Sequence, residues 1–416
     1  MVAEPSEEQI QQAIAVFVRR PRPLPLFCGV QHYAWGDSEY IPRLLGVANP
    51  EARPFAELWI GAHPDLPARA VIDRIQVPLD RLLAAAPERL LGRELAEKYG
   101  GQLPFLMKIL AAARPLSIQV HPDRRQAVLG YEREDRLGIP LDSPRRNYRD
   151  RNHKPELLCA LTPFYALKGF RPESEIEQAL VEIPEWRRLS EAFRAQGLKR
   201  FYRWLMTLPQ AEVDALLEPL LRRLRSQGPW EKSRREFWLL WADELYSRQG
   251  HHDRGLFSLY LLNFLRLQPG EALFQAAGEL HAYLQGVGVE IMANSNNVLR
   301  GGLTPKHVDV EALLEIVRFQ GGPARVLLPV AHGPEAVYEA PVEEFRLGRI
   351  RLEAGGRFDS SGPLRLGIVL EGRTSLRWNG GAIPLHRGQS YLIPHDFACR
   401  FEAQESLTLY QGSCYR

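Results

Sequence analysis

Four side chains of kinds that commonly bind divalent metals are spread along the chain. Gln119 and His121 lie in a run of strand character, where alternate residues point to the same face. Glu156 follows a polar loop rich in Pro and Arg, and His281 comes shortly after the turn residue Gly278. Two imidazoles, a carboxylate and an amide oxygen suit a zinc ion with an open position for substrate or water. The same donors would also admit manganese or cobalt.

Taken one at a time, these residues have simpler structural interpretations. A Gln-x-His pair on a buried face arises often by chance, and Glu156 could pair with a neighbouring cation. A single His such as His281 at the start of a strand is more often part of a turn or of the core. The sequence therefore predicts a metal site only if all four side chains converge, which their spacing alone does not prove.

Composition places the chain among globular proteins. It has 416 residues, enough for two or three packed units, with 45% hydrophobic and 25% charged residues. A net charge of only +3 argues against a nucleic-acid binder. We find no signal peptide and no apolar run long enough to span a membrane, and the four scattered cysteines are expected to be free thiols. We therefore expect a cytoplasmic protein without nucleic-acid or membrane partners.

The elements that must position the four side chains are short strands and helices. A helical segment is expected within residues 1–24, ended by prolines. Mixed patterns follow, with strand character around the Gln-x-His pair and helices expected over 84–99 and 105–112. Short alternating strands fill the last block, 336–416, as is typical of a sandwich or jelly-roll barrel. The expected fold is therefore mainly β, with two β-rich blocks that could be related barrels.

Residues 172–255 differ from the rest of the chain because apolar residues recur there at helical spacing. We expect a helical insertion between two strand-rich parts, 25–171 and 256–335. Pro219 should kink or restart one of its helices. Its aromatic residues are expected to pack the insertion against its host.

Seven motifs, in sequence order, resemble those of type I phosphomannose isomerases, which belong to the cupin superfamily. Motifs of this length in this order are very specific, and they cover the chain from about residue 28 to 310. They are YAWG (33–36), ELWIGAHP (57–64), LPFLMKIL (103–110), PLSIQVHPD (115–123), NHKPEL (152–157), GELHAY (278–283) and VLRGGLTPK (298–306).

This resemblance implies a domain organisation and a metal. A cupin jelly-roll catalytic domain, 25–171 and 256–335, would be interrupted by the helical insertion and followed by a second cupin-like barrel, 336–416, without metal. The family's zinc, one per chain, would be held by Gln119, His121, Glu156 and His281, the set already found from the residues. The implied activity is the interconversion of D-mannose 6-phosphate and D-fructose 6-phosphate.

The resemblance also assigns residues around the metal. Aldose–ketose exchange moves a proton between C1 and C2 through an enediol, so it needs a base and an electrophile for the developing oxyanion. Sequence alone leaves the base open among Lys154, Lys108, Glu290, His153 and a metal-bound water. The catalytic positions implied are Arg300, Lys154, Glu290 and His153, and the substrate-binding positions are Lys108, Ser117, Tyr283 and Lys306.

Some features leave alternatives open. Asn296 stands where family members usually have Asp, so any acid role there is lost. A cupin acting on another sugar phosphate, a sugar-phosphate sensor without activity, and an iron oxygenase are the competing interpretations. We expect a small sugar phosphate as the partner, and a monomer or weak homo-oligomer.

Overall fold

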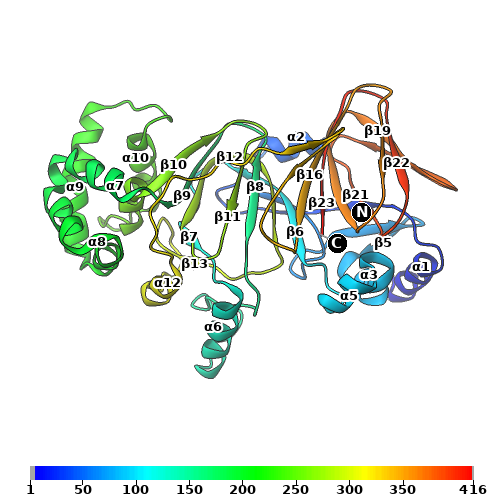
Figure 1. Cartoon of the computed structure of the whole chain (residues 1–416), viewed down its shortest axis with the longest axis horizontal. Helices are drawn as coiled ribbons and strands as arrows, with labels where there is room; N and C mark the ends of the chain where they lie inside the picture. Colours follow the sequence, from blue (N-terminus) through cyan, green and yellow to red (C-terminus); the bar gives the residue numbers. More distant parts are fainter. Residues whose placement is uncertain (1–4, 415–416) are drawn as a thin grey trace.

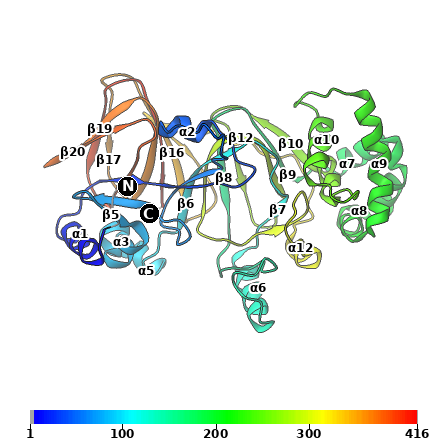
Figure 2. The same cartoon turned by 180° about the vertical axis from the view of Figure 1, so that it is seen from behind.

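The computed structural model describes residues 5–414 and is mainly β-sheet. Its parts lie in a row along the longest axis, with a helical lobe at one end, a strand-rich centre and a second strand-rich part at the other end (Figure 1). The view from behind shows the same order (Figure 2). The sheets are built from antiparallel strand pairs. The predicted fold class, mainly β with a helical insertion, is confirmed.

The centre of the molecule is a 10-stranded sheet organised around the long strand β12. One end of β12 pairs with β7 and β9, and the other end pairs with β6 and β8. The strand therefore brings segments that are far apart in the sequence to one place. The bounds are β2 (Gly29–Gln31), β3 (Glu57–Ile60), β6 (Phe105–Ala112), β7 (Gln119–Val120), β8 (Glu156–Ala160), β9 (Phe164–Phe170), β10 (Leu262–Leu267), β11 (Ala272–Gln275), β12 (His281–Ala293) and β13 (Leu299–Arg300).

The helix predicted over 105–112 is wrong, because Phe105–Ala112 forms strand β6. All its residues are buried, between β3 and β12. A short apolar run buried on both faces has no periodicity that separates a strand from a helix. The helical expectation for 84–99 fits better, since α3, α4 and α5 follow one another through residues 79–98.

The second strand-rich part contains a 9-stranded and a 4-stranded sheet. The larger sheet consists of β1 (Leu24–Phe27), β4 (Arg69–Ile72), β5 (Ile75–Pro78), β14 (Val330–His332), β15 (Glu335–Tyr338), β16 (Arg346–Leu352), β18 (Arg365–Glu371), β21 (Ser390–Ile393) and β23 (Leu407–Ser413). The smaller sheet consists of β17 (Arg357–Ser360), β19 (Arg373–Trp378), β20 (Gly381–His386) and β22 (Cys399–Ala403). Because β1 pairs with β21, N-terminal strands continue a C-terminal sheet across the predicted boundary at 336, and the domain division stays a prediction.

The helical lobe packs around buried aromatic side chains. Trp186, Phe201 and Trp238 are fully buried in it, in agreement with the predicted packing role. Helix α9 runs through Pro219 as a single helix. The helices of the chain are α1 (Glu7–Arg19), α2 (Tyr40–Leu45), α3 (Leu79–Ala85), α4 (Pro87–Leu91), α5 (Arg93–Lys98), α6 (Arg124–Arg136), α7 (Glu173–Val181), α8 (Arg187–Thr207), α9 (Gln210–Gln227), α10 (Arg235–Tyr246), α11 (Ser258–Leu261) and α12 (Val310–Ile316), with 3₁₀ turns at Pro184–Trp186 and Arg254–Phe257.

Two further expectations concern the whole chain. The four cysteines are free thiols, as predicted. Within residues 5–414, none of the helices has both the length and the apolar composition needed to cross a membrane. The N-terminal helix α1 begins at Glu7 with a capping box at Ser6, and the first four residues of its predicted segment lie outside the described residues.

Candidate metal centre

A cavity of about 1130 Å³ opens beside the metal-ligand candidates. Its wall comes from the central sheet, from the loop that precedes β8 and from the end of α10. Gln119 is part of this wall, together with several cations. The cavity is large enough for a small molecule, and most of its side chains are polar or charged.

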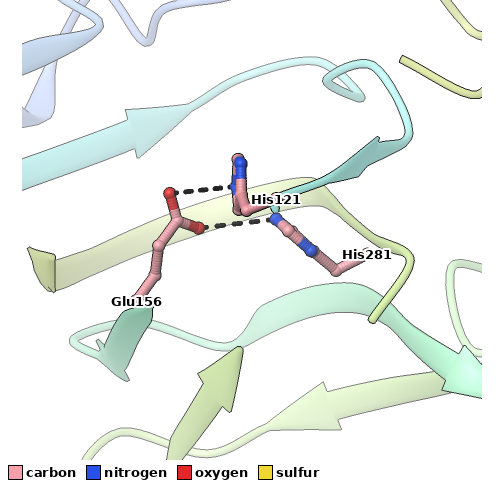
Figure 3. A group of neighbouring side chains, drawn as sticks. All are labelled: His121, Glu156 and His281. Atoms are coloured by element: carbon pink, nitrogen blue, oxygen red, sulfur yellow. Dashed lines mark ion pairs between the residues drawn. The ribbon is translucent and has the colours of Figure 1, made fainter. Parts of the chain in front are cut away.

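Three of the four predicted ligands converge in the structure. Nε2 of His121 lies 3.4 Å from Oε1 of Glu156, and Nε2 of His281 lies 3.4 Å from Oε2 of the same carboxylate. Figure 3 shows both imidazoles turned toward the two carboxylate oxygens. All three side chains are buried, and one ligand atom from each lies within 4.8 Å of the others. The structure thus gathers residues from three separate motifs into a possible metal site.

Strand pairing explains why these side chains meet. Gln119 on β7 is the register partner of His281 on β12 and of Arg300 on β13. Cross-strand partners point to the same face of a sheet, so these three side chains form one row. Glu156 is the first residue of β8, which also pairs with β12. The fourth predicted ligand therefore adjoins the other three, although its Nε2 donates to Oγ of Ser117 at 3.3 Å.

Backbone carbonyls fix the orientation of both imidazoles. Nδ1 of His121 lies 2.8 Å from the carbonyl oxygen of Asn297, and Nδ1 of His281 lies 3.0 Å from that of Glu279. Because a carbonyl only accepts, each Nδ1 must carry a proton and donate it, so in the neutral imidazole the Nε2 lone pair faces Glu156. Such an outer hydrogen bond is the usual arrangement for metal-binding histidines.

The donor set fits a zinc ion. Nε2 of His121 is buried without a hydrogen-bond partner among the described residues, and it faces a carboxylate. Burial lowers the pKa of His121 to about 4, which keeps the imidazole neutral and able to coordinate. Two neutral imidazoles and a carboxylate are a common zinc ligand set, which Gln119 could complete.

A cation stands next to the ligand set. Nζ of Lys154 lies 2.9 Å from Oε1 of Glu156 and lines the cavity. Burial alone would raise the pKa of Glu156, but the charge of Lys154 holds that pKa well below its usual range. The carboxyl is therefore ionised, as a metal ligand must be.

Deeper in the barrel, Lys108 lies between two buried carboxylates. Its Nζ is 3.3 Å from Oε2 of Glu290 and 3.4 Å from Oε2 of Glu57. Burial alone would lower the pKa of Lys108, but the charges of Glu57 and Glu290 raise it. Burial and the charge of Glu156 raise the pKa of Glu290 to about 7. One lysine between two carboxylates leaves this group able to hold a proton near neutral pH.

The other predicted residues lie at different distances from the cavity. Arg300, Lys306, Ser117 and Lys108 line it, whereas Glu290 is buried behind Lys108. Tyr283 is also buried, on the same strand as His281. His153 is directed to Glu344, whose Oε1 lies 2.7 Å from its Nε2. These positions describe the site, and the roles assigned to the residues stay predictions.

Glu57, Trp59 and Arg149 are among the residues of the cavity wall that sequence reasoning missed. Glu57 accepts a hydrogen bond from Nε1 of Trp59 at 2.7 Å, and Lys108 lies 5.2 Å from the centre of the Trp59 ring. Glu57 and Trp59 alternate within ELWIGAHP, and this spacing on a strand could have indicated a shared face. Arg149 had no comparable signal, because it lies in a loop rich in arginine.

The buried ligand set on antiparallel β-strands is that of a metal-binding enzyme with a cupin-like fold. A family model described as "Phosphomannose isomerase type I, catalytic domain" matches residues 24–173. The mannose-6-phosphate isomerase of Salmonella typhimurium is 38% identical over 389 residues, covering 89% of this chain and 94% of that protein. The human mannose-6-phosphate isomerase is 36% identical over 357 residues, covering 79% of this chain and 81% of that protein. The chain belongs to the type I phosphomannose isomerase family.

Solved structures agree with this assignment. The structure of the Salmonella typhimurium enzyme bound to substrate, fructose 6-phosphate, and zinc has a TM-score of 0.86 and 36% identity. The match covers 95% of this chain and 100% of that chain. The predicted family resemblance and the cupin-like fold are confirmed.

Proposed function

We propose that this chain interconverts D-mannose 6-phosphate and D-fructose 6-phosphate in the cavity beside His121, Glu156 and His281. The observation that carries this is the convergence of these three buried side chains next to a cavity whose wall includes cations without a carboxylate partner in the described part of the chain. The related enzyme solved with fructose 6-phosphate and zinc supports both the substrate and the metal.

One zinc ion per chain would be held by Gln119, His121, Glu156 and His281. When bound, zinc supplies a Lewis acid that polarises the substrate's carbonyl and hydroxyl oxygens. The protein fixes the two imidazoles through the carbonyls of Asn297 and Glu279. Lys154 lies close enough to Glu156 to donate to it or to a substrate oxygen.

Two observations support a proton-transfer role for Glu290 acting with Lys108. The pKa of Glu290 is raised to about 7 by burial and by Glu156, so the group can take and return a proton near neutral pH. Lys108 lies between Glu290 and the cavity. Its ammonium group can therefore donate hydrogen bonds both to Glu290 and to a substrate oxygen. His153 is a weaker candidate for the base because Glu344 and Arg124 occupy its Nε2.

Arg300 is proposed to stabilise negative charge that develops on the substrate. It lines the cavity in the same row as Gln119 and His281, and its guanidinium has no carboxylate partner among residues 5–414. A permanent cation with a planar fork of donors is suited to a phosphate or an enediolate. Ser117 and Lys306, on the same wall, are proposed to hold the substrate.

The proposal also covers location, assembly state and domain roles. We place the protein in the cytoplasm as a monomer or weak homo-oligomer, on its scattered free thiols and balanced charge. The catalytic unit would be residues 25–171 and 256–335, with the helical insertion 172–255 at its rim and the block 336–416 as support.

A coupled assay on mannose 6-phosphate, with and without a chelator, tests the proposed function. Zinc-dependent formation of fructose 6-phosphate is expected. Binding of the sugar phosphate without turnover, in zinc-loaded protein, would instead indicate a sensor. Turnover of other aldose phosphates in place of mannose 6-phosphate would assign the site to a different substrate.

A further inference from the structure

One side of the cavity carries three cations that lack partners. Arg149, Arg300 and Lys306 all line it. Among residues 5–414, no carboxylate lies within ion-pair distance of these three side chains, and none of the three donates a side-chain hydrogen bond. The cavity cations Lys108 and Lys154, by contrast, are each paired with carboxylates.

The three side chains are close enough to act on one another. Burial and the charge of Arg149 lower the pKa of Arg300. Burial, Arg300 and Arg149 together lower the pKa of Lys306. Burial raises the pKa of Tyr246. Arg114 and Arg248, two other cations of the wall that have no ion pair with any described residue, oppose that rise through their charges, so they form a separate group. Like charges gathered in this way are unfavourable unless an anion joins them.

The backbone of Arg149 is held firmly although its side chain is exposed. Its N–H donates to Oδ1 of Asn297 at 2.7 Å. The Asn297 amide in turn donates to the carbonyls of Asp150 and Asn152, at 2.9 and 2.8 Å. Asn297 is fully buried and lies three positions before Arg300 in the chain. One buried amide therefore ties the loop of Arg149 to the segment that carries Arg300.

The same asparagine also connects this loop to the metal-ligand set. Its carbonyl oxygen accepts the hydrogen bond from Nδ1 of His121 at 2.8 Å. The position of Arg149 relative to the ligands is consequently set by the fold and does not depend on its own side chain. An anion bound at Arg149 would lie at a fixed place relative to the reacting end of the substrate.

We propose that Arg149 is a specificity-determining residue that binds the substrate's phosphate group together with Lys306. Arg300, which shares a row with Gln119 and His281, then faces the reacting end of the substrate. This inference rests on the proposed function, since it assumes a sugar phosphate in the cavity. A phosphate dianion accepts several charge-assisted hydrogen bonds, and Arg can donate two of them in parallel. Arg149 thereby favours phosphorylated sugars over neutral ones, and it contacts a part of the substrate remote from C1 and C2.

The test compares Arg149→Met with Arg145→Met in zinc-loaded protein. Arg145 lies on the same loop, is exposed and is not part of the cavity wall. Loss of Arg149 is expected to raise KM for mannose 6-phosphate about 10- to 100-fold, with kcat within about threefold, because a remote contact is equally strong in ground and transition state. The inhibition constant of inorganic phosphate should rise by a similar factor. Arg149→Lys should partly restore KM and this inhibition constant. Arg145→Met should leave both constants unchanged.

A second measurement separates this inference from the proposed function. Calorimetric titration with inorganic phosphate requires no turnover, so it reports on Arg149 even if the protein fails to isomerise mannose 6-phosphate. Weaker phosphate binding in Arg149→Met than in Arg145→Met would support the anion site by itself. Unchanged KM and unchanged phosphate binding in folded, zinc-loaded Arg149→Met would overturn the proposal. A loss confined to kcat would do so as well, because it would place Arg149 in the chemical step.

Discussion

Nε2 of His121 lies 3.4 Å from Oε1 of Glu156 yet makes no hydrogen bond within the described part of the chain. Its ring proton is committed to the carbonyl of Asn297 on the other side of the imidazole. A buried lone pair facing a buried carboxylate is unfavourable unless a cation lies between them. A metal ion bound between the two groups would satisfy both at once.

Removing the metal with a chelator is therefore expected to abolish isomerase activity, and adding zinc back should restore it. One ion per chain should be found in the active protein by elemental mass spectrometry, because only one ligand group of this kind occurs among residues 5–414. Thermal unfolding should also occur at a lower temperature after chelation, since a bound ion stabilises the state that binds it. Full activity in metal-free protein would contradict the prediction.

Replacing a single imidazole should lower metal occupancy together with turnover. His121→Ala and His281→Ala each remove one nitrogen ligand of the metal. Each also removes an imidazole that lies 3.4 Å from the buried carboxylate of Glu156. Zinc content per chain and kcat are the measurements. His386→Ala is the matched control, because His386 is exposed on β20 and its Nδ1 lies 3.0 Å from the carbonyl oxygen of the next residue, Arg387. If both variants kept full occupancy, other residues would have to hold the metal.

The sequence predicted the convergence of His121, Glu156 and His281 more accurately than it predicted the secondary structure around them, and their role as ligands stays a prediction. Gln119, His121, Glu156 and His281 could be chosen from residue types and motifs, because metal coordination restricts which side chains can act. Strand β6 was mistaken for a helix, because its residues are buried on both faces and show no period. Similarly, the pairing of β1 with β21 brings together residues 24–27 and 390–393, and no local pattern encodes such a distant contact.

Residue type alone did not show where two catalytic candidates lie relative to the cavity, and their catalytic roles stay predictions. His153 and Glu290 have suitable chemistry, but neither lines the cavity: His153 is directed to Glu344, and Glu290 lies behind Lys108. Glu57, which does line the cavity, was overlooked because its alternation with Trp59 indicates a shared face but not which face points into the cavity. Such assignments depend on tertiary packing, which sets burial and partners.

Two adjacent arginines of the helical insertion, Arg222 and Arg223, are expected to be dispensable for turnover. Arg222 pairs with Glu218 on the same helix, and Arg223 binds Glu185 through two nitrogens, at 2.6 and 3.0 Å. Neither arginine lines the cavity. Substituting both with Ala should therefore leave turnover within a few-fold and lower stability by roughly 1–2 kcal/mol, through the partly buried pair with Glu185. A thousandfold loss of kcat in folded protein would place this helix in the active site.

Glu344 should make stability depend on acidic pH. Burial alone would raise the pKa of Glu344, but hydrogen bonding from His153 lowers that pKa to about 2. A carboxyl whose pKa is lower in the folded state contributes stability above its unfolded pKa of about 4.3, and loses that contribution as the pH falls toward 2. Glu344→Gln should thus reduce the free energy of unfolding by about 1 kcal/mol at pH 6.

Denaturant unfolding at several pH values checks the sign of this effect. The difference between the native protein and Glu344→Gln should be largest at pH 6 and shrink between about pH 4.3 and pH 2, because Glu344 then becomes protonated. Glu343→Gln is the neighbouring control, since Glu343 is exposed and pairs with Lys98. A difference that grew as the pH fell would show that the His153–Glu344 contact does not stabilise the folded state.

Asn296 separates two proposals for the proton relay, because it stands where the family usually has an acid. Its Nδ2 donates to Oδ2 of Asp65 at 3.1 Å, and its backbone N–H donates to Asp150 at 2.7 Å. An amide can orient neighbours but cannot shuttle protons at neutral pH. If a carboxylate here were indispensable, Asn296→Asp would raise turnover by about 10²–10⁴-fold.

We expect Asn296→Asp to change kcat by less than about tenfold, because the base is placed elsewhere and a new carboxylate would face Asp65 at hydrogen-bond distance, where like charges repel. Arg300→Ala should instead cost about 10²-fold or more, through lost stabilisation of negative charge in the cavity. Both variants are compared with the native protein at saturating zinc, with metal content measured in each. A large gain in kcat from Asn296→Asp, together with a small loss from Arg300→Ala, would contradict this prediction. Such a result would show that a carboxylate at residue 296 takes part in proton transfer and that the charge of Arg300 is dispensable.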